Sequence, residues 1–337
     1  MRGLTVDFGQ RGGAKLRAVD HLSFGLREGQ TLALVGESGS GKSTVVRAVG
    51  QLERRTSGDI LLDGRPAGRH GQALRAYRRK VQLVFQDPFA SLNPMHTVRH
   101  HLTRPLLLRP GHHRGAELDQ AVDELLRSVN LTPPDEIARK YPHELSGGQR
   151  QRVAIARALA TDPDVLLADE PVSMLDVSIR LEILNLLDRL KRDRNLALLY
   201  VTHDLATARH FSSEIMVMYR GEIVEHGPSD EVILHPAHPY TQILAAAAPD
   251  PTVSRRSLAA ARQTRQSERA TRDAERREVV TGQGCRFRPR CPFAMDICAT
   301  HPQDLQTAPG HLARCWLYGD AAAETVSSAR AGETGEI

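Results

Sequence analysis

The feature that most constrains the fold of this chain is a glycine-rich loop of eight residues. It reads Gly36-Glu37-Ser38-Gly39-Ser40-Gly41-Lys42-Ser43 and fits the pattern G-x-x-x-x-G-K-[ST]. A short apolar run at 31–35 precedes the loop, and a helical pattern over 43–52 follows it. Glycines let successive backbone N–H groups surround phosphate oxygens, and the helix adds the positive end of its dipole. The loop therefore predicts an α/β fold that binds a nucleotide.

The residue types at the end of this loop suit particular parts of a nucleotide. We expect Lys42 to reach the β and γ phosphates, Ser43 to place its hydroxyl on Mg²⁺, and Thr44 to bond the α phosphate. Two carboxylates follow a buried apolar strand at 165–168. We expect Asp169 to hold Mg²⁺ through water and Glu170 to act as general base on the attacking water.

Strand-like and helix-like segments alternate along the chain. Strands are expected within 17–34 and at 81–85, 165–168 and 196–202. A helix is expected over 179–192, where four residues recur on one face: Leu181, Leu184, Leu187 and Leu190. The alternation predicts a core with a parallel sheet. Residues 93–160 read as mainly helical, broken at prolines such as Pro105, and predict an inserted helical subdomain.

The most specific motif is the string Leu145-Ser146-Gly147-Gly148-Gln149. By itself it reads as a helix start with Ser146 as the N-cap. It also resembles the signature sequence of the ATP-binding-cassette (ABC) ATPases, and the resemblance covers about residues 1–250. In that family two cassettes close on ATP, and each signature serves the nucleotide of the opposite cassette. The resemblance thus implies that Ser146, Gly147, Gly148 and Gln149 contact a partner's ATP.

The same resemblance implies roles for further residues. Gln86 matches the glutamine that touches Mg²⁺ and the attacking water, and His203 matches the histidine that contacts the γ phosphate. The segment 173–176 resembles the D-loop, with Met174 in place of the usual alanine and Asp176 retained. Phe8 is the candidate for stacking on adenine, although an ordinary core role is also open for it.

A narrower resemblance lies in three segments: 85–94, 235–241 and 284–292. They look like the extended Q-loop, the segment after the core and the C-terminal cysteine region of cassettes that serve dipeptide, oligopeptide and nickel importers. The resemblance implies the ATP-hydrolysing subunit of a peptide importer. It also implies a similar but distinct second cassette, two membrane permease subunits and an extracytoplasmic substrate-binding protein. The cargo stays open between di- or oligopeptides, nickel and another small solute.

Four cysteines follow the spacing C-x5-C-x6-C-x16-C: Cys285, Cys291, Cys298 and Cys315. Four thiolates in one short segment can bind Zn²⁺ or a [4Fe–4S] cluster. The resemblance to peptide importers favours the iron–sulfur cluster, and zinc or free thiols remain alternatives. A histidine group, His96, His100 and His101, is expected to form a polar helix face and not a metal site.

Composition limits the remaining functions. The net charge of +5 is carried by arginines spread along the chain, without the interleaved aromatic residues that stack on bases, so we expect no nucleic-acid partner. No apolar run is long enough to cross a bilayer, and residues 1–13 lack the apolar core of a signal peptide. We therefore expect the chain at the cytoplasmic face of the membrane, held there by permease subunits. A soluble cassette acting on ribosomes or DNA is the less favoured alternative.

The expected organisation has four parts. Residues 1–250 form the nucleotide-binding domain, with the helical subdomain at about 93–160. Residues 251–280 form a charged linker, residues 281–319 form the cysteine-rich region, and residues 320–337 form a disordered tail.

Overall fold

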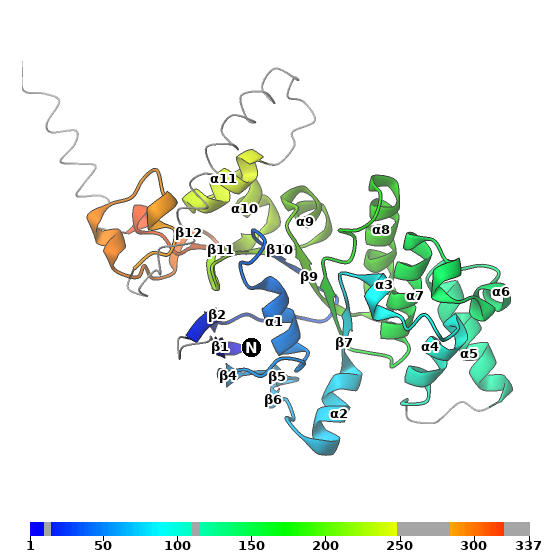
Figure 1. Cartoon of the computed structure of the whole chain (residues 1–337). Coiled ribbons are helices and arrows are strands. Elements are labelled where there is room, and N and C mark those ends of the chain that lie inside the picture. Colours follow the sequence, from blue (N-terminus) through cyan, green and yellow to red (C-terminus); the bar gives the residue numbers. More distant parts are fainter. Residues whose placement is uncertain (10–14, 110–114, 248–283, 320–337) are drawn as a thin grey trace, which may run out of the picture.

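A computed structural model of the chain describes residues 1–9, 15–109, 115–247 and 284–319. The whole expected charged linker and the whole expected tail lie outside these ranges. Figure 1 shows a central sheet with helices on both faces, a helical unit on the right and the C-terminal region on the left.

The central sheet has eight strands in the order β12-β13-β11-β10-β3-β9-β8-β7. Their bounds are β3 Thr31–Val35, β7 Val81–Val84, β8 Val165–Asp169, β9 Ala197–Thr202, β10 Glu214–Tyr219, β11 Glu222–Pro228, β12 Leu305–Ala308 and β13 His311–Ala313. The run from β10 to β7 is parallel, and β11, β12 and β13 are antiparallel to their neighbours. Every residue of β3 and β9 is buried, as expected for strands covered on both faces. The predicted α/β core with a parallel sheet is confirmed.

A smaller antiparallel sheet covers one face of the central sheet, with the first helix between them. It has the order β2-β1-β4, and a short hairpin, β5 and β6, lies nearby. The bounds are β1 Arg2–Gly9, β2 Lys15–Leu22, β4 Ser57–Asp59, β5 Leu61–Leu62, β6 Arg65–Pro66 and α1 Lys42–Val49. Val45 and Val46 of α1 share one buried apolar cluster with Val6 of β1 and Leu167 of β8. This packing holds the start of α1 against the ends of the parallel strands.

The strands expected within 17–34 are β2 and β3, and a loop separates them. Between β2 and β3, residues 23–30 are not strand. Gly29 there adopts φ 67°, which a continuous strand excludes. The helix α2, Gly71–Lys80, precedes β7 and buries Tyr77.

The opposite face of the central sheet is covered by α8 Val177–Arg194, α9 Leu205–Phe211, α10 Ser229–Leu234 and α11 Pro239–Ala247. Leu184, Leu187 and Leu190 of α8 are buried, as predicted. The inclusion of Leu181 in that face was wrong, because its side chain is 54% exposed. A spacing of three residues drifts around a helix with 3.6 residues per turn, so the first leucine of the series lies off the buried face.

The helical unit contains α3 Pro88–Ser91, α4 Val98–Leu106, α5 Ala116–Ser128, α6 Pro134–Arg139, η1 Pro142–Glu144 and α7 Gly147–Leu159. The mainly helical character expected for 93–160 is confirmed. A helix break at Pro105 was a wrong prediction, because Pro105 lies inside α4, near its end. There the missing N–H removes one hydrogen bond of the final turn and leaves the earlier turns intact.

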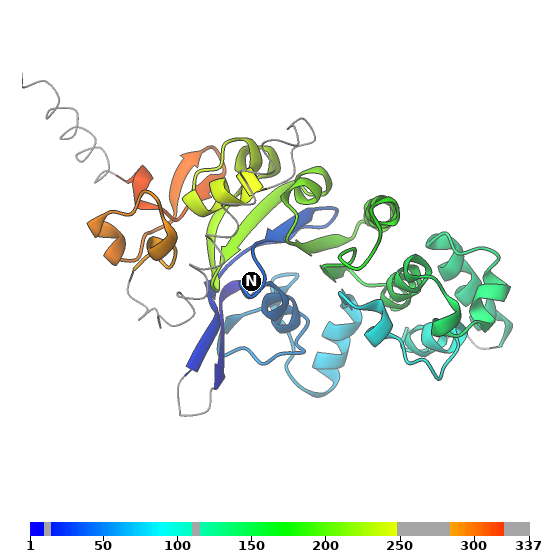
Figure 2. The same ribbon diagram turned by 45° about the horizontal axis from the view of Figure 1, so that its top comes forward.

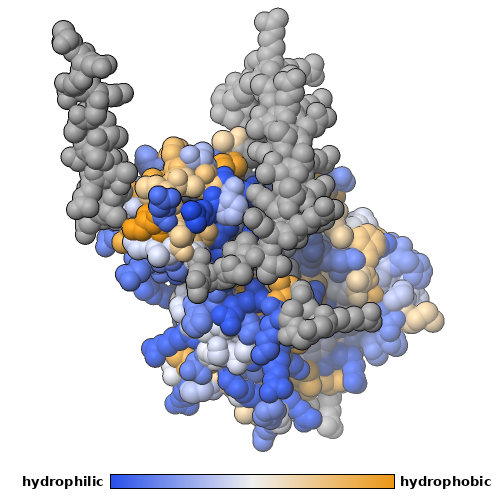
Figure 3. Space-filling view, turned by 60° about the vertical axis from the view of Figure 1, so that its left-hand side comes forward, coloured by the Kyte–Doolittle hydropathy of each residue, from blue (hydrophilic) through white to orange (hydrophobic). Residues whose placement is uncertain are grey.

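The C-terminal residues 284–319 join the edge of the central sheet. They form η2 Arg288–Arg290, η3 Asp296–Ala299, β12, β13 and η4 Trp316–Tyr318, and β13 pairs with β11. Figure 3 shows the molecule from this side as a mainly hydrophilic surface, with hydrophobic residues gathered toward the upper left. Within the described ranges no helix combines the length and the apolar character that crossing a bilayer requires.

Candidate functional site

The glycine loop connects the buried strand β3 to α1, as predicted. Gly41 is the N-cap of α1 with φ 108°, and a Cβ there would collide with the carbonyl oxygen of Ala18. Only glycine suits this close approach with a positive φ. No side chain caps α1, so the first N–H groups of the helix are available to an anion such as a phosphate. Thr44 lies half-buried in that first turn.

Lys42 is buried inside the loop, with 5% of its surface exposed. Its ammonium donates to the carbonyl oxygens of Gly36 at 2.7 Å and Glu37 at 2.9 Å. Burial lowers the pKa of Lys42, while the carboxylates of Glu170, Asp169 and Glu37 act in the opposite direction. The positive charge is therefore already placed where the loop would hold phosphates.

Ser43 and Asp169 meet across the start of α1 and the end of β8. The Ser43 hydroxyl donates to Asp169 Oδ1 at 3.1 Å, and Asp169 is 5% exposed. Burial raises the pKa of Asp169, and the hydrogen bond from Ser43 partly opposes the rise. A hydroxyl and a carboxylate side by side form an all-oxygen donor pair, which fits the preference of Mg²⁺.

Glu170 lies between Gln86 and His203. Gln86 Nε2 donates to Glu170 Oε2 at 3.2 Å, and His203 Nδ1 lies 3.2 Å from the same oxygen. These residues follow the neighbouring parallel strands β7, β8 and β9, whose carboxyl ends share one edge of the sheet. Glu170 has φ 45°, and its N–H donates to the carbonyl oxygen of Val201 at 3.0 Å, so the turn after β8 is anchored to β9. The three side chains predicted to act on the γ phosphate and water are thus brought together.

An open pocket of about 630 Å³ lies beside these groups. Gln86 and Asp169 line it from the sheet, and Phe85 and Arg157 line it from β7's end and from α7. Phe89 in α3 and Met95 in the loop after α3 have exposed side chains.

The signature string forms the start of α7. Ser146 accepts from the N–H of Gln149 at 3.2 Å, and its own N–H donates to Gln149 Oε1 at 3.0 Å, which makes a capping box. A Cβ on Gly148 would lie 2.7 Å from Ile179 Cγ2 of α8, so this glycine allows close helix packing. Figures 1 and 2 both show α7 well apart from α1. The signature therefore does not join the phosphate loop of its own chain.

Two further predicted residues occupy less defined positions. Asp176 lies exposed at the start of α8 without a capping hydrogen bond. Phe8 is half-buried on β1 and packs against the cluster that contains α1. Its role as adenine platform stays a prediction.

The four cysteines line one small pocket, together with His238, Phe287 and Trp316. Burial raises the pKa values of Cys285, Cys291 and Cys315, the last to about 11. In the ranges that the structure describes, no three His, Cys, Asp or Glu side chains are arranged to share a metal ion. The four thiols share a pocket, but they do not stand in the geometry of a bound cluster or zinc ion.

Two contacts with the phosphate loop were missed from the sequence. Tyr240 of α11 accepts a hydrogen bond from the N–H of Glu37, and Arg290 of η2 pairs with the Glu37 carboxylate. No motif marks either residue as part of a nucleotide site.

Two family models match the chain. The model described as "ABC transporter" matches residues 19–173, and the model described as "Oligopeptide/dipeptide transporter, C-terminal region" matches residues 224–298. The two matches lie in the order that the motifs predict.

Individual proteins are similar over most of the chain. The "Probable peptide ABC transporter ATP-binding protein y4tS" of Sinorhizobium fredii is 43% identical, over 93% of this chain and 86% of the relative. The "Putative peptide import ATP-binding protein BOV_A0347" of Brucella ovis is 41% identical, over 94% and 96% of the two chains. Among solved structures, the dimeric ATP-binding cassette MJ0796 bound to ADP and Pi has a TM-score of 0.61 at 32% identity, over 68% of this chain and 97% of that one.

Proposed function

This chain belongs to the ABC transporter family of ATPases, and we propose that it is the ATP-hydrolysing subunit of an importer for di- and oligopeptides. The match of residues 224–298 and the names of the relatives support this cargo class. Import of nickel or another small solute is the alternative, and the names of the relatives do not favour it. A soluble cassette acting on ribosomes or DNA is not favoured by the match of residues 224–298 to a transporter region.

We propose that the reaction is attack of water on the γ phosphorus of ATP, which breaks the bond to the β–γ bridging oxygen and releases ADP and phosphate. The loop N–H groups and Lys42 hold the phosphates, and Glu170 accepts the proton of the water. Gln86 and His203 hold the Glu170 carboxylate from two sides and orient the water and the γ phosphate. Mg²⁺, when bound, supplies positive charge at the β and γ phosphates, and Ser43, Gln86 and Asp169 are the residues that would hold it.

The observation that carries this proposal is the Glu170 carboxylate held at 3.2 Å from both Gln86 and His203, directly after the buried Asp169. We expect Glu170→Gln to bind ATP and to lower the turnover by about 10²- to 10⁴-fold, the usual contribution of a general base. Phosphate release by the assembled transporter measures this effect. The matched control is Glu182→Gln, which changes a carboxylate with 62% exposure on α8. Normal hydrolysis by Glu170→Gln would show that another group is the base.

We propose that the active unit contains two cassettes, this chain and a similar but distinct one. The signature lies away from the phosphate loop of its own chain, so it is available to a partner's ATP. Three apolar side chains near the start of α8 support an interface beside the D-loop, because they are more than half exposed: Met174, Val177 and Leu181. A solved relative is dimeric.

We propose that two permease subunits hold the chain at the cytoplasmic face of the membrane and that an extracytoplasmic binding protein delivers the cargo. The open pocket between the sheet and α7 supports a docking site for a permease segment, since Ala90 and Ser91 of α3 line it and the neighbouring Phe89 exposes 52% of its surface. Gln86 lines the same pocket and touches Glu170, so docking and hydrolysis share a residue. Co-purification with the permease subunits tests this assembly.

We also propose that residues 281–319 form a cysteine-rich region that binds a [4Fe–4S] cluster, with Zn²⁺ as the alternative. The support is that Cys285, Cys291, Cys298 and Cys315 all line one pocket. Holding either group requires the thiols to lose their protons and draw together. Iron and sulfide analysis of protein purified without oxygen tests this, and protein with neither iron nor a visible absorption band would contradict it. The division into a nucleotide-binding domain, linker, cysteine-rich region and tail is likewise a proposal.

A further inference from the structure

We propose that Arg290 and Tyr240 are positioning residues for the phosphate loop, so that the C-terminal region sets the affinity of the site for ATP. The inference rests on the proposed function, because it concerns how that site binds its nucleotide. Both residues lie outside every nucleotide-binding motif of the chain. Arg290 is in η2, in the C-terminal region, and Tyr240 is in α11.

Arg290 holds the side chain of Glu37, the second residue of the loop. Its two terminal nitrogens lie 3.1 and 3.2 Å from the two carboxylate oxygens, which is a bidentate pair. The Arg290 side chain is 13% exposed, and its guanidinium lies 5.7 Å from the Phe287 ring centre and 5.8 Å from that of Tyr219. A planar guanidinium packed beside aromatic rings keeps one orientation. This ion pair therefore has a defined geometry, whereas an exposed ion pair does not.

Tyr240 holds the backbone of the same residue. Its hydroxyl accepts a hydrogen bond from the Glu37 N–H at 2.9 Å, and the residue is completely buried. Burial raises the pKa of Tyr240, so the phenol stays neutral. The ring contacts Tyr219 at 4.6 Å and Phe287 at 5.5 Å between centres. Glu37 is therefore fixed at its backbone and at its side chain by groups that share one aromatic cluster.

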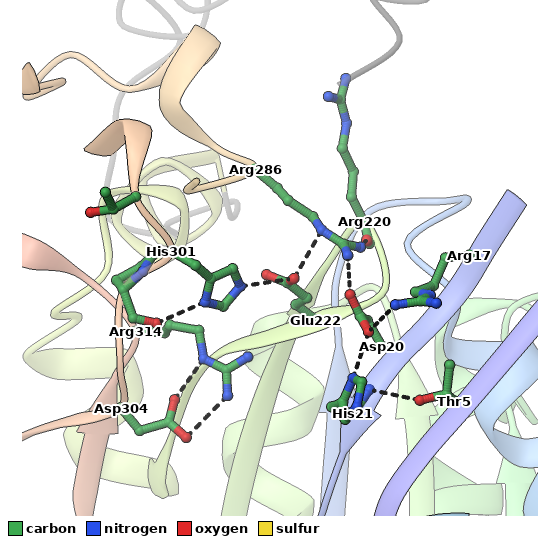
Figure 4. A network of polar contacts seen from close by, with 12 residues as sticks. Thr5, Arg17, Asp20, His21, Arg220, Glu222, Arg286, His301, Asp304 and Arg314 are labelled. Carbon is green, nitrogen blue, oxygen red and sulfur yellow. Dashed lines mark hydrogen bonds and ion pairs between the residues drawn. The ribbon is translucent and has the colours of Figure 1, made fainter. Parts of the chain in front are cut away.

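A second arginine of the C-terminal region, Arg286, contacts the turn that hydrogen-bonds to the loop at Ser40. Figure 4 shows Arg286 between the carboxylates of Asp20 and Glu222, with a further bond to the carbonyl oxygen of Arg220. The next residue, Gly221, donates its N–H to the carbonyl oxygen of Ser40 at 2.8 Å. The C-terminal region thus touches the loop directly at Glu37 and through one turn at Ser40.

These contacts bear on binding more than on the chemical step. Glu37 accepts from Lys42 through its carbonyl oxygen, so its backbone position helps to place the ammonium. Its carboxylate, left unpaired, would repel a triphosphate nearby, and Arg290 cancels that charge. The side chains proposed for the chemical step follow β7, β8 and β9, whereas Arg290 and Tyr240 bond to the loop at Glu37. Loss of Arg290 should therefore raise the KM for ATP more than it lowers kcat.

The test uses the full chain and its own ATP affinity. We expect Arg290→Ala to raise the Kd of ATP with Mg²⁺ roughly tenfold, equivalent to about 1.4 kcal/mol. Arg290→Lys should recover part of the affinity, and Tyr240→Phe, which removes only the acceptor, should weaken binding several-fold. Arg288→Ala removes an exposed arginine of the same 3₁₀ turn and should leave the affinity unchanged.

A double-mutant cycle with Glu37→Gln keeps the inference testable if Arg290→Ala folds poorly. If Arg290 acts through Glu37, the effect of Arg290→Lys should be smaller in the Glu37→Gln background than in the wild type. Equal ATP affinity in the wild type, Arg290→Lys and Tyr240→Phe would overturn the inference and leave the proposed function intact. A wild-type chain that binds no ATP would overturn both.

Discussion

The buried carboxylate of Glu225 connects the C-terminal region to the nucleotide-binding core, and its removal should destabilise this connection. Glu225 lies in β11 and is 1% exposed. Its Oε1 accepts from the N–H of Ala237 at 2.8 Å and faces His311 Nε2 at 2.7 Å, and its Oε2 accepts from the N–H of His238 at 2.8 Å. One side chain therefore links β11 to the start of α11 and to β13.

The expected loss follows from these three contacts. An unpaired buried donor costs about 1–3 kcal/mol, and Glu225→Ala removes the acceptor of three such groups. Since some of these groups can find water after relaxation, we expect about 3–5 kcal/mol in total for Glu225→Ala. At about 2–4 °C per kcal/mol, the apparent Tm should fall by roughly 6–20 °C. Glu225→Gln keeps one acceptor oxygen and should lose about 1–3 kcal/mol.

Thermal unfolding of the purified chain, followed by circular dichroism, measures the change. Glu231→Ala is the matched control, because that glutamate forms an exposed pair with His235 at 3.4 Å on α10. Such a pair contributes about 0–1 kcal/mol. Because α11 carries Tyr240, Glu225→Ala should also weaken ATP binding at temperatures where the chain is folded. Equal melting temperatures for Glu225→Ala and Glu231→Ala would show that the Glu225 carboxylate does not stabilise this connection.

Two further substitutions test the site itself. A Cβ on Gly148 meets Ile179 at 2.7 Å, so Gly148→Ala should shift α7 against α8 and lower the ATPase rate of the assembled transporter several-fold. ATP binding to the phosphate loop of the same chain should stay unchanged, because α7 lies apart from α1. Ile179→Ala in the same chain should restore part of the rate, and equal rates for Gly148→Ala and wild type would contradict this. Burial raises the pKa of Asp169 in the folded chain above the ordinary value of an exposed aspartate. Folding stability is therefore lost as the pH rises from the unfolded pKa through the folded pKa, because the buried carboxyl must ionise. Asp169→Asn should therefore melt higher than wild type at pH 7 while Mg²⁺-dependent hydrolysis falls about 100-fold or more, and a lower Tm would refute the reasoning.

The candidate site was predictable because its residues lie at the ends of short buried strands. Gln86, Glu170 and His203 each follow an apolar run, and parallel strands bring such ends to one edge. The strand order that makes β7, β8 and β9 neighbours was not readable from the chain. The strand β10 was missed although its apolar run 215–219 carried a detectable signal.

Other elements had no such signal. The helix α2 is rich in arginine and buries only Tyr77, so few apolar residues mark it in the sequence. The C-terminal region forms short 3₁₀ turns and strands of three or four residues, too short for a periodic pattern. Its contact with the loop, between Arg290 and Glu37, joins positions 253 residues apart. Local propensity does not report a contact at that separation.

The composition of the phosphate loop explains why distant contacts matter to it. Three glycines in eight residues make the loop able to surround phosphates, and the same residues lose the most conformational freedom when the loop is ordered. Hydrogen bonds and ion pairs from outside the loop order it before ATP binds. They reduce the conformational entropy that ATP binding must then remove. Tyr240 and Arg290 supply such bonds at Glu37, and Gly221 supplies one at Ser40. The motif alone therefore predicts that a nucleotide binds, whereas the affinity depends on residues that follow the motif by about two hundred positions and more.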